Sequence, residues 1–489
     1  MSERDRRHMP NRFLFIAPIF NGAPNGTKRT FDGAALTPIW RDNVKKRLAG
    51  LLACAVLLCG CSAGISVENL LTAPKLNAEQ TAIYQALTNS VGGGVKLRYP
   101  KSGDYRSAFI LKNIDDEPGD EALVFYESQS VQSGESSLRL KLLDKDEGGV
   151  WTAVYDIACV GSDVDSISFA TLGSSEDIDI IVRYSMFNQA EKAFGVLNYV
   201  DGALVELYSS AYACLEVIDL NGDGLDELLS VTTDRANQTS AASLFTNGES
   251  GFEKLSETAL GGGAVDYVSV TKGRLDEKTT AVFLDYSRGS GQYGTDVVYC
   301  YGSRVINPDT AGVSSPSTLI SRFTNDFMGE IYSTDIDGDG FIEIPATTAL
   351  PGYETLTRPE QLCAVTWYTI RDDNAVQEYY TYYSSKYRFA LVFPNRWQGF
   401  VTAVVNSADN EIVFLSYTAE TGLEINAATE LMRIRAVDKD DADGIAAAKG
   451  MTLLGESEDT LYCCTETAGY KTSALALTES ELHNCFIIL

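Results

Sequence analysis

Five segments of this 489-residue chain repeat one plan: an apolar strand, a polar or acidic loop, and a second strand rich in branched or aromatic residues. They begin at Phe109, Ile167, Leu215, Val268 and Ile331. Aligning Glu121, Asp179, Glu227, Thr280 and Glu343 gives spacings of 58, 48, 53 and 63 residues. About fifty residues are enough for a four-stranded blade of a β-propeller. The repeats therefore predict a mainly β fold with a propeller over residues 95–386.

The flanking segments have a different pattern. Residues 62–94 form a tether that ends in a short helix, because Ile83, Tyr84 and Leu87 are spaced for one helical face. After residue 387, strand patterns mix with helical patterns at 441–450 and 478–486. A small α+β domain is expected over residues 387–489.

The N-terminal segment has the pattern of a secretion signal. Lys45-Lys46-Arg47 precedes thirteen uncharged residues, Leu48–Gly60, which is typical of a signal peptide and short for a membrane span. Leu58-Cys59-Gly60-Cys61 resembles the lipobox of bacterial lipoproteins, which implies lipidation of Cys61. We expect residues 1–61 to be signal peptide and lipobox, with translation starting at Val44 rather than Met1. The protein would then be lipid-anchored on the extracytoplasmic face of a bacterial cell membrane.

The charge is distributed unevenly. The net charge is −28, but residues 1–60 carry ten Lys or Arg against four Asp or Glu, so that residues 61–489 carry −34 (−28 − 6). So acidic a body repels phosphate backbones and anionic lipid surfaces. Nucleic acid is therefore excluded as a partner.

Histidine and cysteine usage limits the chemistry further. The only histidines, His8 and His483, lie close to the two chain ends, which excludes a Ser-His-Asp triad, a Cys-His pair and a multi-histidine metal site in the body. The seven cysteines after Cys61 are scattered, without CxxC spacing. They are expected to be buried apolar residues rather than a disulfide framework.

Two of the five loops have oxygen-bearing side chains at positions 1, 3, 5 and 9. Ca²⁺ prefers six to eight oxygen ligands, and glycines at positions 4 and 6 allow the sharp curl that brings such side chains together. The carbonyl group of position 7 adds a ligand. The candidate ligands are Asp219, Asn221, Asp223, Leu225 and Glu227 in the first loop, and Asp335, Asp337, Asp339, Phe341 and Glu343 in the second.

These loops are not EF-hands. Position 12 is Ser230 or Ala346, and Pro345 excludes a following helix. The strand–loop–strand arrangement resembles the FG-GAP (VCBS-type) repeats of integrin-like β-propellers, which implies a cation in the hairpin of a blade. The alternative is a pair of solvated acidic turns. The shorter loop 115–121 remains open as a third site, and the loops at 172–179 and 273–280 lack the ligands.

No catalytic constellation stands out in the sequence. There is no GxSxG motif and no histidine base in the body, and carboxylate pairs are uninformative in so acidic a chain. The sequence favours a cell-surface binding or scaffolding module for protein or glycan ligands, stabilised by Ca²⁺. An extracellular polysaccharide lyase or hydrolase on a propeller is the alternative. The tyrosines at 379, 380, 382, 383 and 387 fit either sugar stacking or, more simply, a strand packed on both faces.

Overall fold

The computed structural model describes residues 76–489, apart from 93–94, 116, 129–135, 147, 174–176, 189–190, 262, 290, 309–330 and 372–373. The signal peptide, Cys61 and most of the predicted tether lie outside these described residues. Within the described part, no helix is both long enough and apolar enough to span a bilayer.

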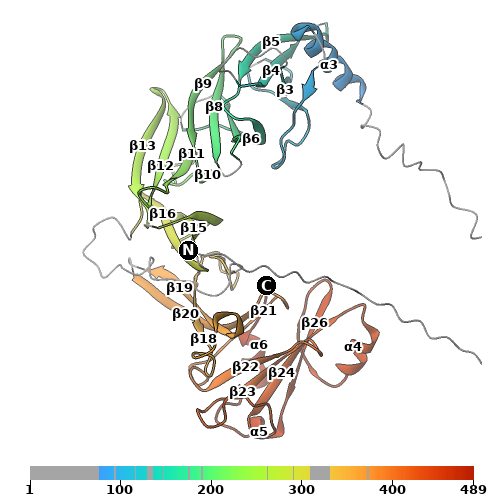
Figure 1. Ribbon diagram of the computed structural model, residues 1–489, viewed down its shortest axis with the longest axis vertical. Coiled ribbons are helices and arrows are strands. Elements are labelled where there is room, and N and C mark those ends of the chain that lie inside the picture. Colours follow the sequence, from blue (N-terminus) through green and yellow to red (C-terminus); the bar gives the residue numbers. More distant parts are fainter. Residues whose placement is uncertain are drawn as a thin grey trace, which may run out of the picture. The chain divides into compact units, whose positions relative to one another are not determined.

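The prediction of a mainly β fold is confirmed: the described chain forms six antiparallel sheets (Figure 1). In the second, third and fourth, strands that follow one another in sequence pair as neighbours, and in the first the two earliest strands both pair with the third strand. The first sheet contains β1 (Lys96–Leu97), β2 (Phe109–Lys112), β3 (Glu121–Glu127), β4 (Leu138–Lys145) and β5 (Trp151–Ala158). The second contains β6 (Asp163–Ala170), β7 (Asp179–Ser185), β8 (Lys192–Val200) and β9 (Ala203–Ala211).

The third and fourth sheets repeat this order. The third contains β10 (Cys214–Ile218), β11 (Glu227–Asp234), β12 (Thr239–Gly248) and β13 (Gly251–Ala259). The fourth contains β14 (Asp266–Arg274), β15 (Thr280–Gly289), β16 (Gln292–Tyr301) and β17 (Arg304–Ile306). The five residues aligned in the sequence begin β3, β7, β11 and β15 or directly precede β18, so the repeat alignment matches the strand boundaries.

The last two sheets include the C-terminal part of the chain. The fifth contains β18 (Ile344–Ala349), β19 (Cys363–Arg371), β20 (Asn374–Ser384), β21 (Phe389–Val392) and β27 (Phe486–Ile488). The sixth contains β22 (Val401–Asn406), β23 (Glu411–Ser416), β24 (Glu430–Asp438), β26 (Thr460–Glu466) and β25 (Thr452–Glu456). The helices are α3 (Ala78–Val91), α4 (Ala442–Ala447), α5 (Ala468–Lys471), α6 (Glu479–Cys485) and a 3₁₀ turn, η2 (Arg358–Glu360).

Consecutive sheets share hydrophobic cores. On β7, Ile180 packs with the first sheet and its neighbour Ile181 packs with the third. On β11, Leu228 faces the second sheet and Leu229 the fourth. Successive residues of a strand point to opposite faces, so a strand buried on both faces is continuously apolar rather than alternating. This explains the apolar runs that begin the second strand of each repeat.

Helix α3 covers part of the first sheet, as its sequence pattern predicts. Ile83 and Leu87 are fully buried against the cluster around Val124 and Trp151. The Asn77 side chain caps the helix by accepting the Gln80 backbone N–H at 2.7 Å. The Gln80 side chain in turn accepts the Asn77 backbone N–H at 3.1 Å. Gly92, with φ 75°, ends it in the left-handed conformation.

The domain boundary predicted at residue 387 falls inside a sheet. β21, from the predicted α+β domain, pairs with β20, and the C-terminal strand β27 pairs with β21. A single hydrophobic core also contains Tyr382 of the fifth sheet and Phe414 of the sixth. The strand and helix patterns after residue 387 are therefore realised, but part of them completes the preceding sheet.

Buried polar contacts join neighbouring sheets as well. Asp179, fully buried at the start of β7, accepts a hydrogen bond of 2.9 Å from the Asn247 amide on β12 of the third sheet. Asp285 on β15 accepts bonds of 2.9 Å from both the backbone N–H and the hydroxyl of Ser333, at the start of the fifth repeat. Burial raises the pKa of both carboxyl groups above the usual value. Each contact links residues that are far apart in the chain.

We predict that Asn247→Ala lowers the free energy of unfolding by about 1–3 kcal/mol at neutral pH, because a buried carboxylate loses a donor. Because the pKa of Asp179 is raised in the folded state, its ionisation destabilises the fold as pH rises through that pKa. At lower pH the group is protonated and this destabilisation is absent. The loss should therefore shrink toward about pH 4. Urea denaturation at both pH values measures it, with exposed Asn395→Ala as the control. An equal loss at both pH values would contradict the role given to the Asp179 charge.

Candidate metal centre

A buried carboxylate organises four of the five repeat loops. In each of them the acid aligned in the sequence, called position 9 after the two acidic loops, accepts the backbone N–H of the residue seven positions earlier. The pairs are Glu121 with Ile114 at 2.8 Å, Asp179 with Leu172 at 3.2 Å, Glu227 with Leu220 at 3.0 Å and Glu343 with Ile336 at 3.0 Å. All four acids are at most 3% exposed. The remaining repeat, the fourth, has Thr280 at this position, and a backbone bond from the Leu275 N–H to the Thr279 carbonyl closes its turn instead.

The loops 219–227 and 335–343 have the same hydrogen-bond scheme. Asp219 accepts the backbone N–H groups of Gly222, Asp223 and Gly224, and Asp335 accepts those of Gly338, Asp339 and Gly340, all at 2.7–3.2 Å. The glycines at positions 4 and 6 all have positive φ between 78° and 90°, a conformation that favours glycine. Two sequences 116 residues apart (335 − 219) therefore adopt the same tight turn.

This turn gathers carboxylates in both loops. Asp219, Asp223 and Glu227 place one oxygen each within 4.8 Å of one another, as do Asp335, Asp337 and Glu343. In the first loop the third carboxylate comes from position 5, and in the second from position 3. Asp339 at position 5 of the second loop is outside its cluster. It accepts the Phe341 N–H at 2.8 Å, and the corresponding Asp223 accepts the Leu225 N–H at 2.9 Å. These are the two such clusters found among the described residues.

Asn221 distinguishes the first loop. Its side-chain amide donates to Asp223 at 3.0 Å and to Glu227 at 2.6 Å, while its Oδ1 accepts the Asp223 N–H at 2.8 Å. The amide nitrogen thus lies between two carboxylates and offsets part of their repulsion. To offer oxygen to a cation at that point, the amide would have to turn over and give up both bonds.

Tyr379 and Arg274 distinguish the second loop. The sequence pattern placed Tyr379 in a run of tyrosines without a role at this loop, and it gave Arg274 no role. The Tyr379 hydroxyl, on β20, donates to Asp337 at 2.6 Å. The Arg274 guanidinium, at the end of β14, lies 4.5 Å from the Phe341 ring centroid and donates to the Asp339 carbonyl at 3.2 Å. No local sequence signal identifies either contact, because the partners are 42 and 65 residues apart in the chain.

The position-9 carboxyl groups have the most perturbed acidity in these loops. Burial, together with the nearby charges of Asp223 and Asp219, raises the pKa of Glu227 to about 7. Burial raises the pKa of Glu343 to about 7 as well, reinforced by Asp337, Asp339 and Asp335. The N–H bonds from Leu220 and Ile336 oppose these shifts. The ionised form of each buried carboxyl group is therefore incompletely compensated by neighbouring positive charge or hydrogen-bond donors.

The donor set fits a hard divalent cation. Every candidate side chain presents oxygen, and the carboxylates already converge from a turn that backbone bonds hold in shape. A calcium ion bound there would neutralise the mutual repulsion of the three acids. Asp219, Asp223, Glu227 and Asn221 would hold it in one loop, and Asp335, Asp337, Asp339 and Glu343 in the other. The carbonyl groups of Leu225 and Phe341 are the further candidates.

The remaining loops have other partners. Asp115 accepts the Glu117 N–H at 2.9 Å, and no cluster of three acids forms among the described residues of loop 115–121. In the second repeat, the Asn247 and Asn198 amides face Asp179, at 2.9 and 3.5 Å. Asp276, in the fourth, accepts the N–H groups of Lys278 and Thr279.

Several other sequence features have structural roles. His483 is exposed on α6, and its ring nitrogens lie 2.8 Å and 3.0 Å from the carbonyl oxygens of Glu479 and Leu453, which raise its pKa. The seven cysteines after Cys61 are free. Tyr380 and Tyr382 pack into the C-terminal core, and Tyr383 packs against Trp367.

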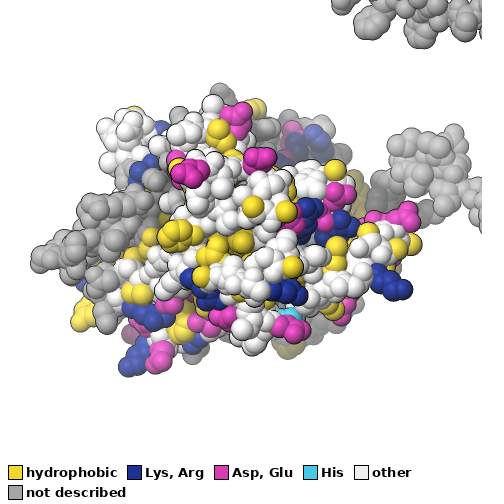
Figure 2. All heavy atoms as spheres, turned by 90° about the horizontal axis from the view of Figure 1, so that it is seen from below, with side chains coloured by type: hydrophobic (Ala, Val, Ile, Leu, Met, Phe, Trp, Pro, Cys, Tyr) yellow, Lys and Arg dark blue, Asp and Glu magenta, His cyan; other side chains and the backbone are white. Residues whose placement is uncertain are grey.

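Lys, Arg, Asp and Glu side chains are interspersed on the face drawn in Figure 2, and no large area of that face has charge of one sign.

We predict that Asn221→Asp destabilises the protein in chelator, because it replaces two hydrogen bonds with a fourth carboxylate. The expected loss is about 1–3 kcal/mol of unfolding free energy. The reciprocal change Asp337→Asn removes a charge while keeping an acceptor for Tyr379, so it should be neutral or stabilising under the same conditions. Thermal melting of both variants in chelator provides the measurement. Equal effects of the two changes would show that carboxylate repulsion does not control these loops.

Comparison with known proteins identifies no family. No protein-family model matches this chain, and no curated protein matches it in sequence. Among solved structures, a periplasmic gluconolactonase of Pseudomonas aeruginosa is 13% identical with a TM-score of 0.22, over 68% of this chain and 90% of that one. A rhamnogalacturonan lyase of Bacillus licheniformis is 11% identical with a TM-score of 0.27, over 69% of this chain and 77% of that one. At these TM-scores, the likeness supports no conclusion about the fold or the activity of this protein.

Proposed function

We propose that this protein is a calcium-stabilised binding or scaffolding module, built as an FG-GAP-like β-propeller and carried on a lipid anchor. The supporting observation is the pair of loops at 219–227 and 335–343, which share one hydrogen-bond scheme and each gather three carboxylates. Two copies of an elaborate turn that concentrates negative charge are costly without a cation, and a bound divalent ion would turn that cost into stability.

The proposed propeller is supported by the way in which the sheets follow one another. Antiparallel sheets of four or five strands succeed each other along the chain, and consecutive sheets share cores. Each proposed cation loop also meets the preceding sheet: the Gly173 N–H donates to the Asp226 carbonyl at 2.8 Å, and the Ile342 N–H to the Arg274 carbonyl at 3.1 Å. A cation would therefore stabilise joints between blades as well as single hairpins.

The proposed location follows from the N-terminal sequence. Lys45-Lys46-Arg47, the apolar run and Cys61 have the order of a lipoprotein signal. The body would then lie on the extracytoplasmic face of a bacterial membrane, attached through Cys61. Such a position suits a module that holds a protein or glycan ligand at the cell surface.

Calcium should raise the melting temperature of the protein relative to chelator, because it binds the folded turns and not the unfolded chain. At a concentration one hundred times the dissociation constant, each site would add about 2.7 kcal/mol. Magnesium should substitute poorly, since it demands octahedral geometry and releases its water reluctantly. Scanning calorimetry of the purified full-length protein in calcium, magnesium and chelator tests this.

Two double variants make that experiment specific. Asp223→Ala with Asp337→Ala removes one clustered carboxylate from each loop and should abolish most of the calcium effect. Glu249→Ala with Glu277→Ala removes the same charge from exposed positions outside the clusters and should preserve it. Superimposable melting curves in calcium and chelator would refute the cation proposal.

Cys61→Ala should release the protein from membranes or stall its processing. Two acyl chains anchor a protein stably where one is marginal, and the acidic body adds no attraction to anionic lipid. Membrane fractionation and mass spectrometry of the N-terminal peptide provide the measurement, with Cys54→Ala as the control. A Cys61→Ala variant that is normally processed and still bound to membranes would exclude the anchor.

A further inference from the structure

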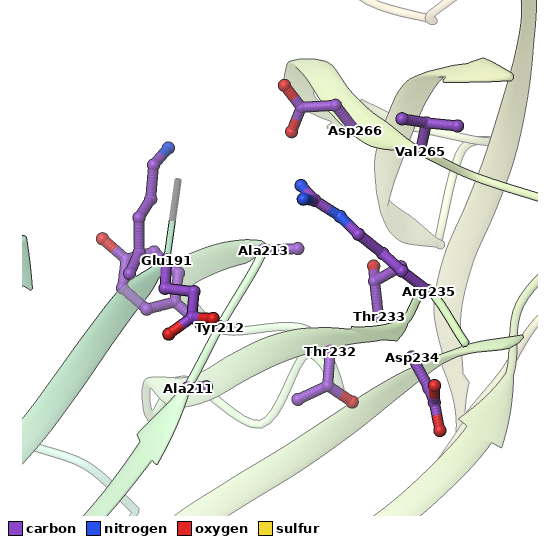
Figure 3. A pocket seen from close by; sticks show the side chains of 11 residues that line it. Glu191, Ala211, Tyr212, Ala213, Thr232, Thr233, Asp234, Arg235, Val265 and Asp266 are labelled. Atoms are coloured by element: carbon purple, nitrogen blue, oxygen red, sulfur yellow. The ribbon is translucent and has the colours of Figure 1, made fainter. Parts of the chain in front are cut away.

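A pocket lies at the edge of the sheets opposite the acidic loops. Its volume is about 460 Å³, within the range of roughly 300–1,000 Å³ of small-molecule sites. Three sheets line it: the start of β8, the end of β9 with Tyr212 and Ala213, the end of β11, and the start of β14 (Figure 3). Since β11 begins at Glu227 and ends at Asp234, the pocket and the first acidic loop are at opposite ends of the same strand.

The backbone of the pocket wall is fixed by hydrogen bonds. The Tyr212 N–H donates to the Lys192 carbonyl at 3.1 Å, the Ala213 N–H to the Val231 carbonyl at 2.7 Å, and the Val265 N–H to the Ser287 carbonyl at 2.7 Å. The Tyr212 ring lies edge-on to Phe194, with centroids 5.9 Å apart. Burial raises the pKa of Tyr212 to about 12, so its hydroxyl remains a hydrogen-bond donor at physiological pH.

Two cations are available in this pocket. Arg235 extends across it toward Asp266, whereas Asp234 points away (Figure 3). Asp234 is committed to the turn after β11, where it accepts the Ala236 N–H and the Asn237 N–H and amide. Within the described chain, no carboxylate lies within 4.0 Å of the Arg235 guanidinium or the Lys192 amine.

Other cations of the same sheets are paired with acids. Lys254 pairs with Glu257 at 2.7 Å, and Lys272 with Glu216 at 3.1 Å. The chain as a whole carries a net charge of −28, yet two cations without a close carboxylate partner line this one concave site, which can therefore accept an anionic group. Arginine in particular matches the planar geometry of a carboxylate.

We propose that this pocket binds a uronic acid unit of a glycan, with Arg235 and Lys192 on its carboxylate. Glu191 and Asp266 line the same pocket and can accept hydrogen bonds from sugar hydroxyls, while Thr232, Thr233 and the Tyr212 hydroxyl can donate to ring and hydroxyl oxygens. Those two acids disfavour a polyanion such as a phosphodiester chain. The proposal deepens the binding role proposed above by naming a ligand class and a site, and it does not depend on calcium.

The test is isothermal titration of the full-length protein with three probes. They are a disaccharide with one terminal glucuronate, the same disaccharide with glucose in that place, and glycylglycine, which offers a carboxylate and an ammonium group but no hydroxyls. We expect binding of the acidic disaccharide, and affinity at least about tenfold lower for its neutral counterpart. Stronger binding of glycylglycine would assign the pocket to a peptide or amino acid and overturn the proposal.

Three single variants locate the interaction. Arg235→Ala should weaken binding at least about tenfold, and Lys192→Ala should also weaken it, because each removes a charged partner of the carboxylate. Lys278→Ala, an exposed cation on the β14–β15 turn at the other edge of the sheets, should change affinity less than about twofold. Arg235 and Lys192 are exposed, so their variants should fold, and the melting temperature checks this.

Two results overturn the proposal: no binding of the acidic disaccharide by the folded protein at about 10 mM, or unchanged affinity in Arg235→Ala. Calorimetric melting of the same samples separates this from the cation proposal. Stabilisation by calcium without sugar binding refutes only the pocket, and sugar binding without a calcium effect refutes only the cation sites.

Discussion

The hydrogen bond between a buried position-9 carboxylate and a backbone N–H seven residues earlier is the interaction on which the repeat depends. It closes the first loop of four sheets, through Glu121, Asp179, Glu227 and Glu343. In each case the carboxylate is at the start of a strand that is buried on both faces. The bond satisfies a buried N–H, but it leaves a negative charge in a low-dielectric environment. Each repeat therefore needs a way to compensate that charge.

The repeats meet this need in different ways. The second uses amides, because Asn247 and Asn198 face Asp179. The fourth avoids the charge by having Thr280. The third and fifth add more carboxylates to the first, and the proposed cation would compensate this additional charge. Tyr379 and Arg274 extend the fifth repeat's loop into contacts with β20 and β14, so that ligand binding there would act on more than one sheet.

The two edges of the sheets present opposite chemistry. The acidic loops concentrate carboxylates at one edge, whereas the pocket at the other has Arg235 and Lys192 without close carboxylate partners. Antiparallel strands of this length separate the edges, so a cation at one and an anionic ligand at the other need not compete. A chain with a large negative charge can in this way still offer a local site for an anionic group.

The sequence alone was sufficient to predict the mainly β fold, the start of each repeat's second strand and the short helix before the first sheet, and it identified two loops of matching sequence that adopt the same turn. These features depend on local periodicity, on glycines that permit positive φ, and on side chains within nine residues of one another. Contacts between distant residues were decided only by the tertiary structure. Asn247 meets Asp179, Tyr379 meets Asp337, β27 completes the sheet that contains β20, and Arg235 reaches a pocket lined by three sheets. No local pattern encodes these contacts, because each depends on how whole sheets pack and therefore on cores assembled from residues far apart in the chain.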